Sequence, residues 1–322
     1  MFIVTGGAGF IGSAVIWMLN SKGIDDILVV DNLGDSLKWK NLVNRQYRDY
    51  VHKSAFLESI DKHRFGQSDT IIHLGACSST TETDADYLMA NNFHYTVTLA
   101  THALAKGVRF INASSAATYG DGSHGFSDDV AELGNLKPLN MYAYTKHLFD
   151  CWTVRHKALS HLASLKFFNV FGPNEYHKGD MCSLVYKGFK QIRANGSLRL
   201  FKSYHSDYPD GGQRRDFIYV KDCADVIGWL VDNPSANGLF NLGTGRARSW
   251  NDLATALFQA NDKPVNIEYI DMPERIQNAY QNYTCADMHK LKASDCPVQF
   301  AELEDAIADY VQQYLMQDDP YL

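Results

Sequence analysis

The sequence lacks several features that would mark a membrane, metal-binding or nucleic-acid-binding protein. No apolar run among its 322 residues is long enough to cross a bilayer, so we expect no membrane partner. Its six cysteines have no close paired spacing and its twelve histidines form no His-x-x-x-His cluster, which predicts no metal site. A net charge of −7 argues against a nucleic-acid partner. These absences favour a soluble protein with a small-molecule ligand.

The sequence also lacks internal repeats and low-complexity tracts. A strand-like pattern begins at residue 2, which predicts no targeting segment. Without export, scattered reduced thiols indicate a cytoplasmic location. With 45% hydrophobic residues, the chain can form one large domain or two moderate ones.

A glycine-rich turn at the amino terminus is the most informative motif. The apolar, β-branched run at 2–5 predicts a buried strand, and Gly6, Gly9 and Gly12 follow at three-residue steps as a helical pattern begins. Such glycines permit a sharp turn, a close approach to a pyrophosphate and tight packing of helix on strand. A second strand at 27–31 ends in Asp31. Together these segments predict a dinucleotide site.

The first half of the chain alternates between strand-like and helix-like segments. This pattern predicts an α/β fold, a Rossmann-type doubly wound parallel sheet with a smaller, interwoven α/β substrate domain. Further strands are expected at 70–74, 108–112 and 164–168, and helices near 84–106 and 141–156. Strands at 216–220 and 238–242 are expected to return to the main sheet. The expected domains are 1–167 plus about 217–245 for the cofactor, and about 168–216 plus 246–322 for the substrate.

Tyr142 and Lys146 form the candidate catalytic pair. Four residues apart on a helix, they lie on one face, where the ammonium would lower the pKa of the phenol. Such a phenol can exchange the proton of a secondary alcohol while hydride moves. Ser115, at a strand end beside the expected crevice, could bind the same oxygen. An isolated Tyr-x-x-x-Lys is usually an ordinary amphipathic helix, but the glycine turn upstream favours catalysis. Tyr144 has no lysine four residues later.

The glycine spacing resembles that of the extended short-chain dehydrogenase/reductases. Within that superfamily the chain resembles the ADP-L-glycero-D-manno-heptose 6-epimerase family through nearly its whole length. The discriminating segments are Gly75-Ala-Cys-Ser-Ser-Thr-Thr81 and His177-Lys-Gly179. Supporting segments are Asp31-Asn-Leu33, Ala113-Ser-Ser-Ala-Ala-Thr-Tyr-Gly120, Phe168-Asn-Val-Phe-Gly-Pro173 and Asn241-Leu-Gly-Thr-Gly-Arg246.

The resemblance implies an enzyme that inverts a secondary carbinol of an ADP-heptose, a precursor of the lipopolysaccharide inner core. One tightly bound NADP per subunit would take up a hydride and return it to the other face of the keto intermediate. Resemblance also implies a homo-oligomer, a pentamer. Lys178 would be the second acid/base group and Lys146 would also bind the nicotinamide ribose. From composition alone, Lys178 would be an ordinary loop lysine.

The choice between NADP and NAD depends on the end of the second strand. Asp31 ordinarily accepts a hydrogen bond from a free ribose hydroxyl, which favours NAD. Lys38 and Lys53 match family positions that face the cofactor, with Asn32 beside the ribose, and therefore favour NADP. The alternative is that Lys38 and Lys53 are ordinary exposed lysines that do not contact a cofactor. The cofactor set also includes Phe10, Ile11, Leu74, Gly75, Ala76, Cys77, Ser78, Asn91, Val170, Lys146 and Lys178.

Resemblance further implies a set of substrate contacts. Arg215 could hold a diphosphate because a guanidinium matches phosphate oxygens. Asp180 and Lys187 depart from the residue types usual in the family, and the loop 203–213 is expanded. The full substrate set is Ser115, Asn169, Asp180, Lys187, Phe201, Lys202, Ser203, Tyr204, Arg215 and Tyr280.

Three alternatives compete with this interpretation. A nucleotide-sugar dehydratase would carry an Asp-Glu pair after the active-site hydroxyl residue, but Ala116 and Ala117 follow Ser115. A galactose-type 4-epimerase shares the serine and Tyr-x-x-x-Lys but not His-Lys-Gly. A non-catalytic redox sensor that binds dinucleotide would lack the tyrosine or the lysine, and this chain has both.

Overall fold

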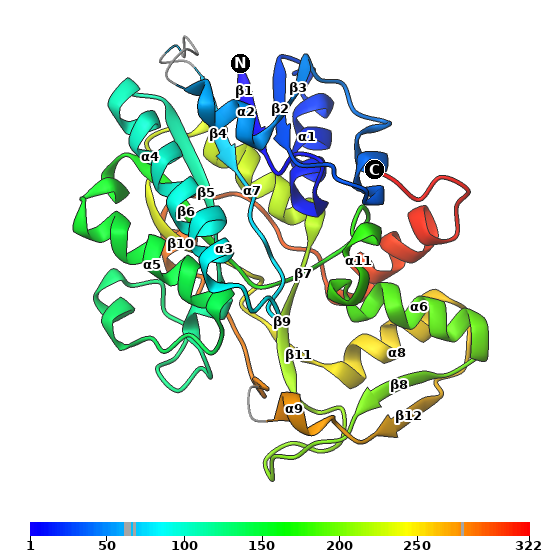
Figure 1. The fold of residues 1–322 in the computed structure, drawn as a ribbon. Helices are drawn as coiled ribbons and strands as arrows, with labels where there is room; N and C mark the ends of the chain where they lie inside the picture. The colour runs from blue at the N-terminus through cyan, green and yellow to red at the C-terminus, as the bar shows by residue number, and fades with distance from the viewer. Residues whose placement is uncertain (61–65, 67–68, 278–279) are drawn as a thin grey trace.

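The computed structural model describes residues 1–60, 66, 69–277 and 280–322. Its centre is a parallel sheet of seven strands in the order β10-β6-β5-β4-β1-β2-β3 (Figure 1). The order reverses beside β1, so the predicted doubly wound Rossmann-type sheet is confirmed. The strands are β1 (Phe2–Thr5), β2 (Ile27–Asp31), β3 (Asp49–His52), β4 (Thr70–His73), β5 (Arg109–Ser115), β6 (Leu162–Phe167) and β10 (Gly238–Leu242).

Helices cover both faces of this sheet, and successive side chains of each strand point alternately toward one helical layer and the other. Val4 points into a hydrophobic cluster with α1 and α7, whereas Ile3 points into a second cluster with α2, α4 and α5. The helices are α1 (Phe10–Ser21), α7 (Val220–Asp232), α2 (Lys53–Glu58), α4 (Tyr95–Lys106) and α5 (Met141–Arg155). Burial on both faces explains why the strands read as continuous apolar runs.

The helix expected at 84–106 contains a change of helical type. It comprises α3 (Ala85–Leu88), a π-helical segment (Met89–His94) and α4, and ends at left-handed Gly107. Asn92, within the π segment, accepts from the amide of Cys77 at 2.8 Å and donates to its carbonyl at 2.9 Å. These two bonds tie the π segment to the turn after β4.

The rest of the chain forms two smaller sheets. One contains β11 (Ala247–Ser249), β9 (Arg214–Tyr219) and β7 (Asn169–Phe171), and the other contains β12 (Ile267–Ile270) and β8 (Leu198–Phe201). Around them pack α6 (Leu184–Asn195), α8 (Trp250–Ala260) and α11 (Leu303–Tyr310), with short α9 (Glu274–Gln277) nearby (Figure 1). The short helix α10 (His289–Ala293) contacts β10 of the main sheet.

The prediction that 216–220 returns to the main sheet is wrong. The backbone of β9 pairs with β7 on one side and β11 on the other, and the position beside β6 is taken by β10. Both segments are equally apolar in sequence, so periodicity alone could not separate them. The prediction for 238–242 is confirmed, and the proposed domain boundaries stay a prediction.

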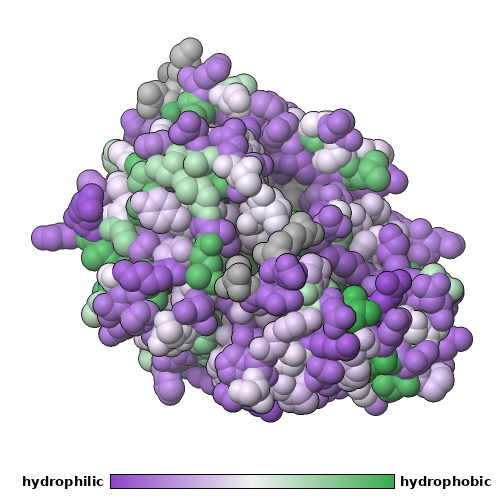
Figure 2. Space-filling model, turned by 60° about the horizontal axis from the view of Figure 1, so that its bottom comes forward, coloured by the Kyte–Doolittle hydropathy of each residue, from purple (hydrophilic) through white to green (hydrophobic). Residues whose placement is uncertain are grey.

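The helices in the described part of the chain include none with the length and apolar character of a membrane span. The face shown in Figure 2 is mostly hydrophilic, with small, separate hydrophobic patches. In the same described ranges, no group of three or more His, Cys, Asp or Glu residues is arranged to hold a metal ion.

Candidate active site

The glycine turn lies against the turn that follows β4. Gly6 has a positive φ of 68°, and a Cβ placed there would lie 2.6 Å from the amide nitrogen of Gly75. A Cβ on Gly12 would lie 2.1 Å from the carbonyl oxygen of Gly6. The backbone is therefore exposed at the start of α1, where a helix N-terminus favours an anion. This cradle fits the diphosphate of a dinucleotide.

Asp31 lies at the carboxyl end of β2 and is nearly fully buried. Its Oδ2 accepts from the amide of Ala8 at 2.9 Å, and its Oδ1 lies 2.7 Å from Lys38 Nζ. Lys53 donates from Nζ to Asn91 Oδ1 at 2.5 Å, and burial together with the charge of Lys38 lowers its pKa. The two predicted lysines therefore gather beside the carboxylate.

Two adjoining cavities, of about 370 Å³ and 120 Å³, lie over this end of the sheet. Every residue of the predicted cofactor set lines one or both of them, except Val170. The larger is lined by Gly6, Gly9, Phe10, Ile11, Gly12, Asp31, Lys38, Leu74, Gly75, Ala76, Ser78, Tyr142, Lys146 and Lys178. The smaller adds Asn32, Lys53, Cys77 and Asn91. They share Gly6, Asp31, Lys38, Gly75 and Ala76, so they form one crevice.

Helix α5 brings the predicted catalytic pair to the larger cavity. Its N-cap, Asn140, accepts from the amide of Ala143 at 2.9 Å, which fixes where the helix begins. Tyr142 is partly buried and lines the cavity, whereas Tyr144 is 45% exposed. Lys146 is buried and donates from Nζ to the carbonyl of Ala113 at 2.6 Å.

The expected lowering of the Tyr142 pKa by Lys146 is wrong in this structure. Burial raises the pKa of Tyr142, and its hydrogen bond with Ser115 opposes that rise. Lys146 directs its ammonium to Ala113, and burial lowers its own pKa to about 8. Desolvation thus acts on both groups and favours their neutral forms.

Lys178 reaches the same cavity from a 3-10 segment, Tyr176–Met181. Its Nζ lies 5.2 Å from the ring centre of Phe10, at the start of α1. Burial lowers the pKa of Lys178, and the nearby Glu175 carboxylate opposes that change. Gly179 follows with a positive φ of 54°, which favours glycine. Two groups able to exchange protons, Tyr142 and Lys178, therefore line one cavity.

Arg215 occupies an aromatic cage outside the two cavities. Its guanidinium carbon lies 5.0 Å from the ring centre of Tyr280 and 5.6 Å from that of Trp250. Trp250 donates from Nε1 to the Tyr280 hydroxyl at 2.9 Å, which joins the two walls. Arg215 also donates from Nη1 to the carbonyl of Arg214 at 2.9 Å, and burial lowers its pKa while Tyr280 opposes that change.

The remaining predicted substrate residues do not gather at the larger cavity. Asn169 begins β7 and lies 3.4 Å from the Thr284 hydroxyl. The Asp180 carbonyl accepts from Lys187 Nζ at 2.7 Å, and Lys202 pairs with Asp271 at 3.0 Å. Phe201 is partly buried at the end of β8, the amide of Ser203 donates to Asp210, and Tyr204 is 55% exposed.

Comparison with known proteins identifies the family. A family model described as the NAD dependent epimerase/dehydratase family matches residues 2–243. The chain belongs to this family. It is 59% identical to the ADP-L-glycero-D-manno-heptose-6-epimerase of Nitratidesulfovibrio vulgaris (strain DP4), with all of both chains covered. It is 46% identical to the protein of the same name from Fusobacterium nucleatum subsp. nucleatum, again over all of both chains.

Solved structures of epimerases share this fold. The crystal structure of Helicobacter pylori ADP-L-glycero-D-manno-heptose-6-epimerase has a TM-score of 0.79 at 25% identity and covers 97% of this chain and 95% of that chain. The complex of Thermus thermophilus UDP-glucose 4-epimerase with NAD has a TM-score of 0.74 at 22% identity, with 95% and 96% covered. The likeness to the 4-epimerase concerns the fold alone.

Several residues at the crevice of this NAD dependent epimerase/dehydratase family member were not in the predicted set. His177 lines the larger cavity, and burial lowers its pKa to about 4. It belongs to the His-Lys-Gly segment, so that motif could have revealed it. Trp250 has no such signal, because only the fold brings it to Arg215. The other additions are Ser36, Ala113, Ser114 and Phe167 in the larger cavity and Thr5, Val30, Tyr87 and Tyr95 in the smaller.

Proposed function

We propose that this epimerase interconverts ADP-D-glycero-D-manno-heptose and ADP-L-glycero-D-manno-heptose by inverting one secondary carbinol through a ketone. The observation that carries the proposal is the presence of Tyr142 and Lys178 on one cavity beside the glycine cradle. Full-length relatives named as heptose 6-epimerases support the same substrate class. The activity would supply a precursor of the lipopolysaccharide inner core.

Inversion by oxidation and reduction needs a group that exchanges a proton with the substrate oxygen in each of the two substrate orientations. Tyr142 would take the carbinol proton in one orientation, with Ser115 holding the same oxygen through a hydrogen bond. Lys178 would return a proton to the ketone oxygen in the other orientation. A bound nicotinamide would accept the hydride in its oxidised form and donate it in its reduced form. The oxidised form would also supply a positive charge. Low solvent exposure of both bases limits exchange with water.

Arg215 would hold the substrate diphosphate. Trp250 and Tyr280 lie beside its guanidinium, and one terminal nitrogen donates to the carbonyl of Arg214, so the remaining donors would contact the phosphate oxygens. The other substrate contacts are the residues proposed from resemblance, including Asn169, Phe201 and the loop that begins at Ser203. We further propose a homo-oligomer, a pentamer, in the cytoplasm.

The proposed cofactor is NADP rather than NAD. Family membership supports a nicotinamide cofactor, and the preference depends on Lys38 and Lys53 at the smaller cavity. Lys38 pairs with Asp31 and so offsets the carboxylate that would repel a 2′-phosphate. The turn from Gly6 to Gly12 would bind the diphosphate of the cofactor, and Lys146 would bind its nicotinamide ribose.

The preference can be tested by replacing Lys38 with methionine. We expect Lys38→Met to weaken NADP binding by at least about tenfold, because the phosphate loses a cation and faces an unpaired Asp31. NAD binding should change much less, since NAD lacks the 2′-phosphate. Fluorescence titration with both cofactors measures the two affinities. Lys40→Met is the matched control, because Lys40 lines neither cavity. Equal loss of NAD and NADP affinity would contradict the assignment.

The reaction itself can be tested by incubation with ADP-D-glycero-D-manno-heptose in heavy water. We expect chromatography to separate two epimers, and mass spectrometry to find no deuterium at the inverted carbon. Deuterium stays out because the hydride would remain on the nicotinamide between the two steps and not exchange with solvent. Absence of the second epimer contradicts the proposed substrate, while substantial deuterium at that carbon indicates proton abstraction from carbon.

A further inference from the structure

Three successive residues of β5 contact three residues of α5 that lie one helical turn apart. The pairs are Ser115 with Tyr142, Ala113 with Lys146 and Ser114 with Asp150. Spacing by four residues places the three α5 side chains along one stripe of the helix. The first two pairs involve the proposed catalytic groups. The third, in which Ser114 Oγ donates to Asp150 Oδ2 at 2.9 Å, has no assigned function.

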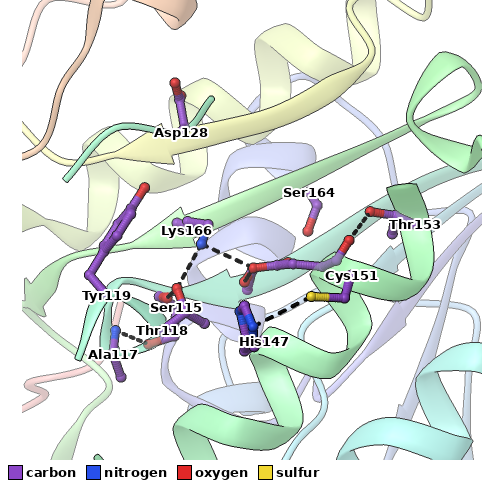
Figure 3. A network of polar contacts seen from close by, with 12 residues as sticks. Ser115, Ala117, Thr118, Tyr119, Asp128, His147, Cys151, Thr153, Ser164 and Lys166 are labelled. Atoms are coloured by element: carbon purple, nitrogen blue, oxygen red, sulfur yellow. Dashed lines mark hydrogen bonds and ion pairs between the residues drawn. The ribbon is translucent and has the colours of Figure 1, made fainter. Parts of the chain in front are cut away.

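Asp150 forms a fully buried ion pair with Lys166 of β6. The two side chains are 0% exposed, and Lys166 Nζ lies 3.2 Å from Asp150 Oδ2. Lys166 also donates to Thr118 Oγ1 at 2.7 Å and lies 4.4 Å from the ring centre of Tyr119 (Figure 3). Thr118 in turn donates to the carbonyl of Ser115 at 2.8 Å. The ion pair therefore joins α5 to the strand end that carries Ser115.

A fully buried ion pair is a costly way to fill space. Desolvation of both charges offsets much of their attraction, and an apolar pair of similar volume often gives equal or greater stability. Here both ions are held by further hydrogen bonds, to Ser114 and to Thr118. The position of the charges beside the catalytic groups is thus a better explanation of the pair than stability alone.

We propose that the Asp150–Lys166 pair is a positioning element that fixes α5 against β5 and holds Tyr142 and Lys146 in register with Ser115. This inference rests on the proposed function for the roles of Tyr142 and Lys146. Neither Asp150 nor Lys166 lines the two cavities, so both act through other residues. The pair also places a carboxylate one turn from Lys146.

The carboxylate has an electrostatic consequence for Lys146. Burial lowers the pKa of Lys146 to about 8, and Asp150 opposes that change. Removing the negative charge should lower the pKa further, so Lys146 would lose its proton at a lower pH. The charge of Lys146 acts on buried His73 of β4, and that of Asp150 acts on His147 and Cys151 of α5 and on Tyr119. Lys137 acts on His147, and Arg155 acts on Cys151.

The test is the double variant Asp150→Asn with Lys166→Met, which removes both charges and leaves no unpaired buried ion. Its pH profile of kcat should fall on the alkaline side at a lower pH than that of the wild type, with KM little changed, because Asp150 raises the pKa of Lys146 and Lys166 is not among the groups that shift it. The Lys146 ammonium, followed by NMR of protein labelled with ¹⁵Nζ-lysine, should titrate at a correspondingly lower pH. The Lys146→Arg variant assigns its resonance.

The matched control is Asp309→Asn with Lys221→Met, a pair 2.7 Å apart that lies away from α5. This control variant should change neither the pH profile of kcat nor the NMR titration of Lys146. If the Asp150/Lys166 variant folds and both measurements match the wild type, the proposal is overturned. If neither this variant nor Asp150→Asn alone folds, the pair is a folding requirement and the proposal is again overturned. Failure of the wild type to epimerise the ADP-heptose would speak against the proposed function only, because the NMR titration needs no substrate.

Discussion

Tyr142→Phe should slow epimerisation by about 10²- to 10⁴-fold, because the variant loses the group that we propose to exchange a proton with the carbinol oxygen. Burial raises the pKa of Tyr142, so the phenol of the structure holds its proton at neutral pH. The positive charge of an oxidised nicotinamide would favour the phenolate. Steady-state rates at saturating substrate measure the loss, while titration with NADP should show nearly unchanged affinity.

Tyr144→Phe is the matched control for this experiment. Tyr144 lies on the same helix, but it is exposed and does not line the cavity. The Tyr144→Phe variant loses the same hydroxyl, and its epimerisation rate should stay near that of the wild type. A Tyr142→Phe variant with near-wild-type activity would remove Tyr142 from the mechanism. A large loss in both variants would instead indicate a general effect on α5.

Lys178→Met should reduce epimerisation by a similar factor of about 10²–10⁴, because the second substrate orientation loses its proposed proton-exchanging group. Partial burial already lowers the pKa of Lys178, which makes proton release easier. A partial reaction on an aldehyde analogue separates the two bases, since hydride transfer can occur from either orientation. Each single variant should keep part of that redox activity, and the Tyr142→Phe/Lys178→Met double variant should lose nearly all of it.

Lys190→Met provides the control for Lys178, because Lys190 is exposed on α6 and lines neither cavity. Its rate should equal that of the wild type. Wild-type epimerisation by Lys178→Met would make Lys178 an ordinary loop lysine, and the two-base mechanism would then fail. Retained redox activity in the double variant would indicate a third proton-exchanging group, and His177 is the nearest in sequence that lines the same cavity.

Local patterns could predict the parts of the site that lie close together in the sequence. The strand, glycines and helix at 2–21 follow one another directly, so their order alone indicated the cradle. Tyr142 and Lys146 share one helix face, and four-residue spacing is sufficient to predict that. The glycine turn, Asp31 and the turn at Gly75 lie at the ends of β1, β2 and β4, and such ends meet at one edge of a parallel sheet. Lys38, Lys53, Asn91 and Lys178 of the predicted cofactor set were instead assigned by resemblance.

Parts that depend on packing between distant segments could not be predicted in this way. Residues 216–220 and 238–242 have similar apolar patterns, and only the competition for the edge of β6 decides which joins the main sheet. The pKa of Tyr142 depends on desolvation, which spacing does not reveal. Lys166 resembles any other lysine in a strand until the fold buries it beside Asp150.

The contact between the two glycine turns constrains how such a site can vary. A Cβ on Gly6 would meet the backbone of Gly75, and a Cβ on Gly75 would lie 2.9 Å from the amide nitrogen of Gly6. A substitution at one of these glycines therefore makes no space for a side chain at the other. Because the obstacle on both sides is backbone, no second substitution can relieve it. Libraries that aim to change cofactor or sugar preference should therefore keep Gly6 and Gly75 fixed and place their diversity at Lys38, Lys53 and the loop 203–213.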